Sequence, residues 1–439
     1  MSAPVIIGGI LLAALIVGVL VAPVGPTRLT GGVVIAIAIS AIVLPPLVVG
    51  VEAAVLLALF AMDAVRSAPR PTVRITLPPM LSRGVPASYT AHVDRPGNGT
   101  RIWLRQARIP DLDLDPFEGW FRIAATVIAH RRGHHVLPPV GLRVVGPFRL
   151  ASWRRTAEAT NEVAVYPDLP AARRLALAVR TNKFRDPGRI TRGPLGLGTE
   201  FESIREYLPD DDVRQVNWRA TARTGHPMTN QFRTEQDRDL VFLLDCGRLM
   251  TAPLGDRTRL DAAVDALAAT AMVSDVVGDR CGVVAFDREV RRSVRPTRAG
   301  ADRVIRAVYD LEPSRADSAF EVAFRSLGTG KRAFVLVFTD LLDLAAARYL
   351  LDAIPVLVRR HAVVVASVVD PDVARVVSEP GEDRDAPYLS AVALDLLEER
   401  RRVVALLEHA GAGVLEATDD DFSAACVSAY LRAKQRARV

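Results

Sequence analysis

Two aspartates follow short apolar segments, in positions where proteins often carry out metal chemistry. Asp245 directly follows the apolar run Leu240–Leu244, and Asp340 follows the run Ala333–Phe338 and Thr339. Because ligands of a doubly wound sheet bind at the carboxyl ends of its strands, both side chains are predicted to lie at one sheet edge. Hard cations such as Mg²⁺ need a near-octahedral set of oxygens, so two carboxylates alone predict a poor site. The alternative is that both carboxylates cap helices or pair with arginine.

The elements that would position these residues alternate between strand and helix as far as the C-terminus. Apolar runs predict strands at 240–244, 282–286, 333–338, 362–368 and 413–417, and helical patterns at 257–277, 344–359 and 394–409 lie between them. Such alternation predicts a parallel sheet that helices cover on both faces. Residues 239–439 are therefore predicted to form an α/β doubly wound domain.

A dense charged block precedes this domain. It interleaves arginines and carboxylates with Phe201, Tyr207 and Trp218, whereas flexible linkers are poor in aromatic residues. One interpretation is a structural ion-pair network that locks the block against the sheet, with Tyr207 and Trp218 filling the seam. The other is a recognition surface, because Trp, Tyr and Arg are enriched at interface hot spots. One block can serve both roles.

The block resembles the signature of the domain-of-unknown-function 58 family, roughly G-x-E-F-x-x-L-R-x-Y-x-x-G-D-D-x-R-x-I-D-W-x-x-x-A-R. Asp210 and Asn217 depart from this pattern, in which Gly and Asp are usual. The matching positions are Gly198, Glu200, Phe201, Arg205, Tyr207, Asp211, Asp212, Arg214, Trp218, Ala222 and Arg223.

The resemblance implies a membrane-anchored protein with a von Willebrand factor A-like domain and a MoxR-type AAA+ ATPase as its partner. Domains of that type hold a divalent cation with a D-x-S-x-S segment, a loop threonine and the aspartate of a T-D-G turn. Here Gly247 and Leu249 stand at the two hydroxyl positions, and Ser318 is a candidate substitute for the threonine. The resemblance therefore implies a degenerate metal site at Asp245 and Asp340. No cofactor is expected, with weakly bound Mg²⁺ as the alternative.

The sequence carries no common catalytic or nucleotide-binding motif. It lacks G-x-x-x-x-G-K-[ST], G-x-S-x-G and H-E-x-x-H. We therefore predict a non-enzymatic, membrane-anchored adaptor or scaffold that binds a protein partner. The alternative is a metal-dependent hydrolase that uses Asp211, Asp212, Asp245 or Asp340, although a paired nucleophile and base are missing. Nucleic acid is not an expected partner, because no basic face with spaced aromatic residues is evident.

The N-terminal part of the chain predicts membrane spans. Within the first 51 residues the only charged side chain is Arg28. The segment Pro4–Val24 is long enough to cross a hydrocarbon core, and the longer apolar stretch Leu29–Val65 is predicted to kink at Pro45–Pro46. We expect two transmembrane helices, with three as the alternative.

Charge and cysteine content predict the compartment. Arginines follow the last apolar segment, at Arg66, Arg70, Arg74 and Arg83. By the positive-inside rule, a multi-pass protein of the cell membrane would keep its bulk in the cytoplasm, with membrane lipid as a further partner. Cys246, Cys281 and Cys426 show no C-x-x-C spacing, so buried reduced thiols are expected.

The length of 439 residues allows two or three domains. Residues 1–67 are assigned to the transmembrane helices, 71–168 to a β-sandwich of immunoglobulin-like type, 169–238 to the signature block and linker, and 239–439 to the von Willebrand A-like domain. Short alternating segments with Gly and Pro between them favour the sandwich.

Overall fold

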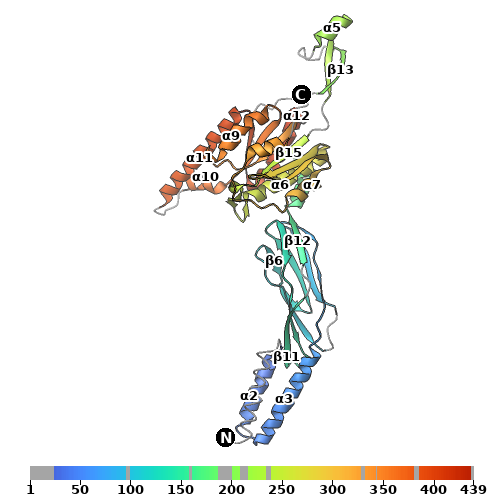
Figure 1. Ribbon diagram of the computed structural model, residues 1–439, viewed down its shortest axis with the longest axis vertical. Coiled ribbons are helices and arrows are strands. Elements are labelled where there is room, and N and C mark those ends of the chain that lie inside the picture. The colour runs from blue at the N-terminus through green and yellow to red at the C-terminus, as the bar shows by residue number, and fades with distance from the viewer. Residues whose placement is uncertain are drawn as a thin grey trace. The chain divides into compact units, whose positions relative to one another are not determined.

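The computed structural model describes residues 24–94, 99–157, 161–185, 200–207, 216–233, 239–327, 332–342, 344–379 and 385–436. The chain divides into two compact units, Met1–Val165 and Tyr166–Val439 (Figure 1). The first unit is rich in strands and the second is α/β. This confirms the predicted multidomain order of a β-rich region followed by an α/β region.

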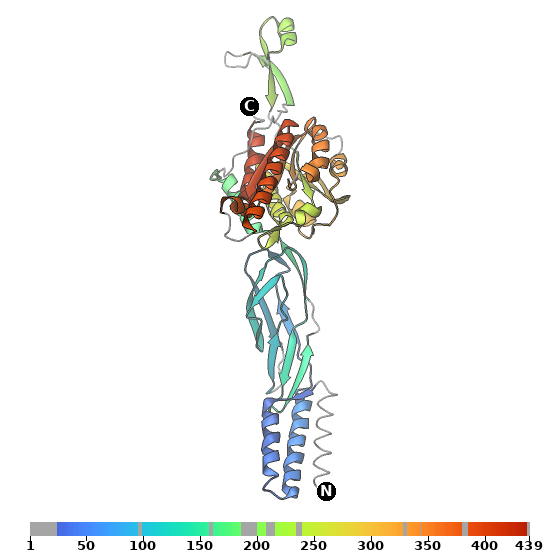
Figure 2. The same cartoon turned by 90° about the vertical axis from the view of Figure 1, so that its left-hand side faces the viewer.

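The first unit begins with an apolar helical hairpin. Helix α2 (Arg28–Ser40) and helix α3 (Pro46–Arg66) lie side by side, as Figure 2 shows. The predicted kink at Pro45–Pro46 is instead a chain reversal, because Pro46 takes the first helical position of α3, where its missing N–H costs nothing. Among the described helices, only α3 is long and apolar enough to cross a membrane. The predicted span Pro4–Val24 lies outside the described residues except for Val24, so a multi-pass arrangement stays a prediction.

Three sheets form the rest of this unit. One has the order β2 (Val73–Thr76), β4 (Ala87–Val93), β8 (Arg122–Ala129) and β6 (Leu112–Asp115). The second has the order β1 (Val24–Pro26), β11 (Ala151–Thr156), β10 (Gly141–Val145), β5 (Arg101–Arg105) and β7 (Glu118–Trp120). The third has the order β3 (Met80–Ser82), β12 (Asn161–Tyr166) and β9 (Gly133–Leu137).

Residues from all three sheets share one apolar core. Alternate residues of β8, among them Ile123 and Val127, point into it, as the two-residue period of a strand requires. Tyr89 is fully buried there and donates its hydroxyl to Gln106 Oε1 at 2.8 Å. Burial raises the pKa of Tyr89 to about 12.

The second unit is built on a six-stranded sheet. Its order is β19 (Val290–Arg298), β18 (Arg280–Phe286), β15 (Asp239–Asp245), β20 (Ala333–Phe338), β21 (Ala362–Val369) and β22 (Gly413–Thr418). Counted from β15, this is the doubly wound order 3-2-1-4-5-6. All neighbouring pairs are parallel except β18 with β19.

Helices cover both faces of this sheet, as predicted. Leu240, Phe242 and Leu244 of β15 belong to a core shared with α6 (Arg259–Val277), α12 (Asp419–Arg436) and α4 (Leu169–Arg180). Val241 and Leu243 belong to the opposite core, with α8 (Phe320–Ser326), α9 (Leu344–Val358) and α11 (Ala386–His409). Helix α4, which falls in the segment assigned to a linker, packs on α6. This unit also contains α7 (Ala301–Val308) and α10 (Pro371–Ser378).

One edge of the sheet is antiparallel and strongly basic. Strand β19 pairs with β18, and the register shifts between Cys281 and Val283. Along it the chain places Arg291, Arg292, Arg295 and Arg298, with Pro296 between the last two. None of the five strands that the sequence predicted for this domain falls here.

Candidate functional site

The two predicted carboxylates lie at the crevice of the doubly wound sheet. Strands β15 and β20 are parallel neighbours, and their carboxyl ends deliver Asp245 and the pair Thr339 and Asp340. The chain leaves these two strands toward opposite sides of the sheet, which makes this edge the usual place for a ligand. Both carboxylates are buried.

Asp245 accepts three hydrogen bonds from its surroundings. Its Oδ1 accepts from the backbone N–H of Gly247 at 2.7 Å and from the hydroxyl of Ser318, and its Oδ2 accepts from Thr339 Oγ1 at 2.6 Å. Burial raises the pKa of Asp245, and the three hydrogen bonds oppose that rise by stabilising the charged form. The carboxylate is therefore built into the sheet edge and not presented to solvent.

Ser318 substitutes in space for a missing hydroxyl residue. A Cβ added to Gly247 would overlap Ser318 Oγ and would lie 3.1 Å from Asp245 Oδ1. Ser318, predicted only as a substitute for a loop threonine, thus fills the volume that a serine at position 247 would need. Thr339, which the sequence placed at the same edge, supplies the second hydroxyl.

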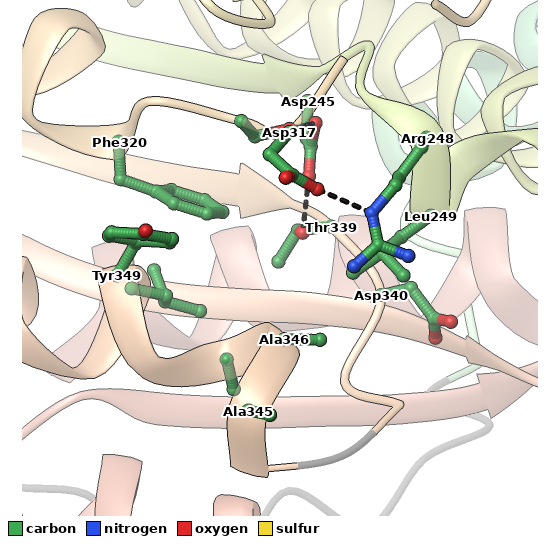
Figure 3. Close-up of a pocket in the computed structure, with 13 residues that line it drawn as sticks. Asp245, Arg248, Leu249, Asp317, Phe320, Thr339, Asp340, Ala345, Ala346 and Tyr349 are labelled. Carbon is green, nitrogen blue, oxygen red and sulfur yellow. Dashed lines mark hydrogen bonds and ion pairs between the residues drawn. The ribbon is translucent and has the colours of Figure 1, made fainter. Parts of the chain in front are cut away.

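Asp340 is neutralised by arginine. Its Oδ1 accepts from the guanidinium of Arg259, which is buried, and from Ser367 Oγ at 3.3 Å. A second guanidinium lies nearby, with Arg400 Nη1 3.9 Å from Asp340 Oδ1. Figure 3 shows the Asp340 carboxylate directed away from Asp245. The arginine pairing that the sequence left open as an alternative is therefore what Asp340 does.

A cavity of about 260 Å³ opens above Asp245. Its rim carries an ion pair between Arg248 and Asp317 (Figure 3). Tyr349 of α9 also lines it, with 62% of its surface exposed. The rim thus combines an exposed aromatic ring with exposed charges of both signs.

The oxygens that a magnesium ion would need at this edge are engaged in hydrogen bonds and an ion pair. Asp245, Ser318 and Thr339 offer oxygens that already hydrogen-bond to one another, and Asp340 is held by Arg259. Within the described residues there is no group of three or more His, Cys, Asp or Glu side chains that could hold a metal. A guanidinium supplies the positive charge that a cation would otherwise bring to Asp340.

The signature block forms a separate antiparallel hairpin. Strands β13 (Glu200–Glu206) and β14 (Met228–Arg233) pair with Phe201 opposite Phe232. Between them lies helix α5 (Trp218–Thr224), which Asn217 caps by accepting from the N–H of Ala220 at 2.9 Å. Asparagine caps a helix as well as aspartate does, so Asn217 serves as the cap where the pattern has Asp.

The structure describes only part of the predicted signature set. Tyr207 is half-buried, and Arg223 is exposed. Trp218 is 70% exposed, so the expectation that it fills a seam is wrong. For Glu200, Phe201 and Arg205 the described part is the backbone of β13, and Asp211, Asp212 and Arg214 lie outside the described residues. The ion-pair network among them stays a prediction.

Sequence reasoning missed the two arginines that face Asp340. Arg259 begins α6, directly after the capping residue Thr258, and Arg400 lies within α11. Neither position carries a local signal, because the contact depends on how both helices pack on the sheet.

Residues 203–378 match the family model described as "Protein of unknown function DUF58". This matched region is similar to members of that family. It contains α5 and both sheet-edge aspartates, whereas β21 is the last sheet strand inside it.

Curated relatives of this chain include uncharacterized proteins of Mycobacterium tuberculosis and Mycobacterium bovis. Each is 26% identical over 183 residues, which cover 40% of this chain and 56% of the relative. The chain thus spans about half the length of the curated relatives it matches.

Solved structures give weaker likenesses. A cohesin module from a Clostridium perfringens family 33 glycoside hydrolase covers 22% of this chain and 97% of its own, at 6% identity and a TM-score of 0.16. A PKD domain of an M14-like peptidase from a Thermoplasmatales archaeon covers 22% and 96%, at 16% identity and a TM-score of 0.15. TM-scores this low say nothing about the fold of this chain.

Proposed function

We propose that this chain is a non-enzymatic, membrane-anchored adaptor that binds a protein partner on the cytoplasmic side. The partner that the family resemblance implies is a MoxR-type AAA+ ATPase. In this proposal the doubly wound domain is a degenerate von Willebrand A-like domain, a reading that the strand order and the aspartates at the switch point support. The apolar helix α3 supports the membrane anchor.

The observation that carries the proposal is the exposure of Trp218. A tryptophan that is 70% exposed at the start of a capped helix leaves a large apolar surface in water. Tryptophan and arginine dominate the hot spots of protein interfaces, and Arg219 and Arg223 on the same helix are exposed. Helix α5 therefore has the composition of a contact surface.

The sheet edge supports binding in preference to catalysis. The carboxylate of Asp245 accepts hydrogen bonds from residues of the sheet edge itself. The guanidinium of Arg259 neutralises Asp340. The exposed groups at this edge are the ring of Tyr349 and the ion pair between Arg248 and Asp317. These groups can dock a partner, and they need no metal to do so.

The test is capture of a co-expressed MoxR-type ATPase by the full chain, solubilised in detergent. Trp218→Ala should weaken capture strongly, because truncation of a hot-spot residue costs about 2 kcal/mol or more, roughly 30-fold in affinity. The melting temperature should stay at the wild-type value, because the ring is exposed. Trp120→Ala is the matched control, since Trp120 is also exposed but lies outside the DUF58 domain. Equal capture by wild type and Trp218→Ala would refute the proposed contact surface.

The metal-dependent hydrolase keeps one observation in its favour. A cavity of about 260 Å³ places Asp245 and Asp317 near the hydroxyls of Ser318 and Thr339. Calorimetric titration of the solubilised chain with Mg²⁺ separates the two functions, and we expect no micromolar binding. Binding that disappears in Asp245→Ala would favour the hydrolase.

A further inference from the structure

The end of the helical hairpin is clamped to one turn of the β-rich unit. Asp63 of α3 is fully buried and accepts three backbone hydrogen bonds, from the N–H groups of Phe148, Leu150 and Ala151, each at 2.8 Å. Gly146 makes room for this carboxylate, because a Cβ at that position would overlap it. Removing this aspartate would leave three amides without their acceptor.

The other helix of the hairpin, α2, is hydrogen-bonded to the same turn through its first residues. Thr30 Oγ1 donates to the carbonyl oxygen of Leu150 at 2.5 Å, and Thr27 Oγ1 donates to that of Arg149. From the sheet side, Trp153 Nε1 donates to the carbonyl oxygen of Ala64 at 3.0 Å. Both helix ends and the turn therefore form one fixed junction.

Three exposed arginines surround this junction. Arg28 begins α2, Arg66 ends α3, and Arg149 lies in the turn itself. Arg66 stacks on Phe148, with its guanidinium carbon 5.8 Å from the ring centre, and Phe148 is 42% exposed. Positive charge and an apolar ring thus meet at the polar end of an apolar hairpin.

We infer that this junction is a binding site for the headgroup of an anionic phospholipid. The inference rests on the proposed membrane anchor. The faces of α2 and α3 carry exposed apolar side chains, among them Ile35, Ile39 and Val55, which a hydrocarbon core would cover. The junction at one end of that apolar length then lies at headgroup level.

The chemistry of the junction favours a phosphate. Arginine forks pair with phosphate oxygens through two parallel hydrogen bonds. The N-terminus of α2, where Arg28 lies, adds the partial positive charge of the helix dipole. Phe148 has the apolar character of residues that insert at the boundary between headgroups and acyl chains. The clamp through Asp63 fixes the spacing of these groups.

The experiment compares lipid retention by four forms of the full chain. Each is reconstituted into nanodiscs of phosphatidylcholine and phosphatidylglycerol and then extracted into detergent, and the co-purifying lipids are quantified by mass spectrometry. The test variant is Arg28→Gln, Arg66→Gln and Arg149→Gln together. The control changes Arg105, Arg108 and Arg131 to Gln, which are exposed in the same unit, and Arg105 pairs with Gly141 at the far end of β10 from the turn. Asp63→Asn is the fourth form.

Wild type and control should retain phosphatidylglycerol above its bulk share. Each arginine removed from the junction should reduce that preference about fivefold, the usual effect of one basic residue near an anionic surface. Asp63→Asn should also weaken it, because the clamp loosens. An unchanged lipid ratio in the triple junction variant would overturn the inference while leaving the anchor intact. Failure of the wild-type chain to enter nanodiscs would overturn the membrane anchor itself.

Discussion

Ser318 Oγ occupies the space into which a side chain at Gly247 would project. A Cβ built on Gly247 would overlap that oxygen and lie 2.9 Å from the carbonyl oxygen of Ala316. Hydroxyls at positions 247 and 318 are therefore alternatives at this sheet edge. The serine that Asp245 uses comes from the loop before α8, and glycine at 247 is the condition for its approach.

Gly247→Ser should lower the free energy of unfolding by about 1–3 kcal/mol, the usual cost of overpacking. Adding Ser318→Gly should recover much of this loss, because it vacates the overlapped volume. Thermal unfolding of the solubilised chain measures both effects. If Gly247→Ser melts like the wild type, Ser318 does not fill that space.

The ion pair between Arg259 and Asp340 predicts a strongly non-additive pair of mutations. Arg259→Met should cost about 3–5 kcal/mol, because it leaves Asp340 buried without its hydrogen-bonded cation. Arg259→Met with Asp340→Asn should cost less than the sum of the single changes. A double-mutant cycle in urea checks this, and additivity would show that the two groups do not interact.

The clamp at Asp63 predicts a loss of stability in the β-rich unit. Asp63→Ala should cost about 3 kcal/mol or more, because three buried amides lose a charged acceptor. Gly146→Ala should destabilise as well, since its Cβ would overlap the carboxylate. Asp113→Ala is the control, because its side chain is 77% exposed. Equal melting temperatures for Asp63→Ala and the control would contradict the clamp.

His361 predicts a stability that depends on pH. Its ring is buried, and burial with the charges of Arg360 and Arg332 lowers its pKa. Its Nδ1 accepts from the N–H of Ala333 at 3.2 Å, which requires that nitrogen to be unprotonated. Below the ordinary histidine pKa of about 6.5, the unfolded chain binds a proton that the folded chain does not.

Stability should therefore fall as the pH decreases through about 6.5 toward the lower pKa of the folded state, by at most about 1.4 kcal/mol per pH unit. Unfolding free energies measured from about pH 8 to pH 5 test this. His361→Gln should lose this contribution to the slope. A variant with the full wild-type slope would assign the pH dependence to other groups.

The sequence predicted the elements with local patterns and missed the contacts that depend on packing. The runs at Leu240–Leu244 and Ala333–Phe338 are continuous and apolar because both faces of their strands are buried, so β15 and β20 could be read directly. The place of Asp245 at the sheet edge could be predicted, because this residue ends a strand. Arg259 did not, because its contact with Asp340 joins a helix to a distant strand end.

The apolar hairpin of α2 and α3 shows the same limit. Apolar length predicted membrane helices, but the buried role of Asp63 depends on a turn that lies far along the chain. The sequence around a single aspartate near the end of an apolar helix does not indicate that it will accept hydrogen bonds from a distant turn. Trp218 could not be placed from the sequence, which allowed either a buried seam or a recognition surface, and the structure shows its ring exposed.

The basic edge strand β19 limits how any protein can join the α/β domain. An exposed edge invites strand addition and aggregation, and lysines, arginines and prolines are the usual protection against both. Pro296 lies where the pairing with β18 shifts register, and the run of arginines repels a second copy of the same strand. Strand addition at this edge is therefore disfavoured, and a partner on this side of the domain would be recognised through side chains.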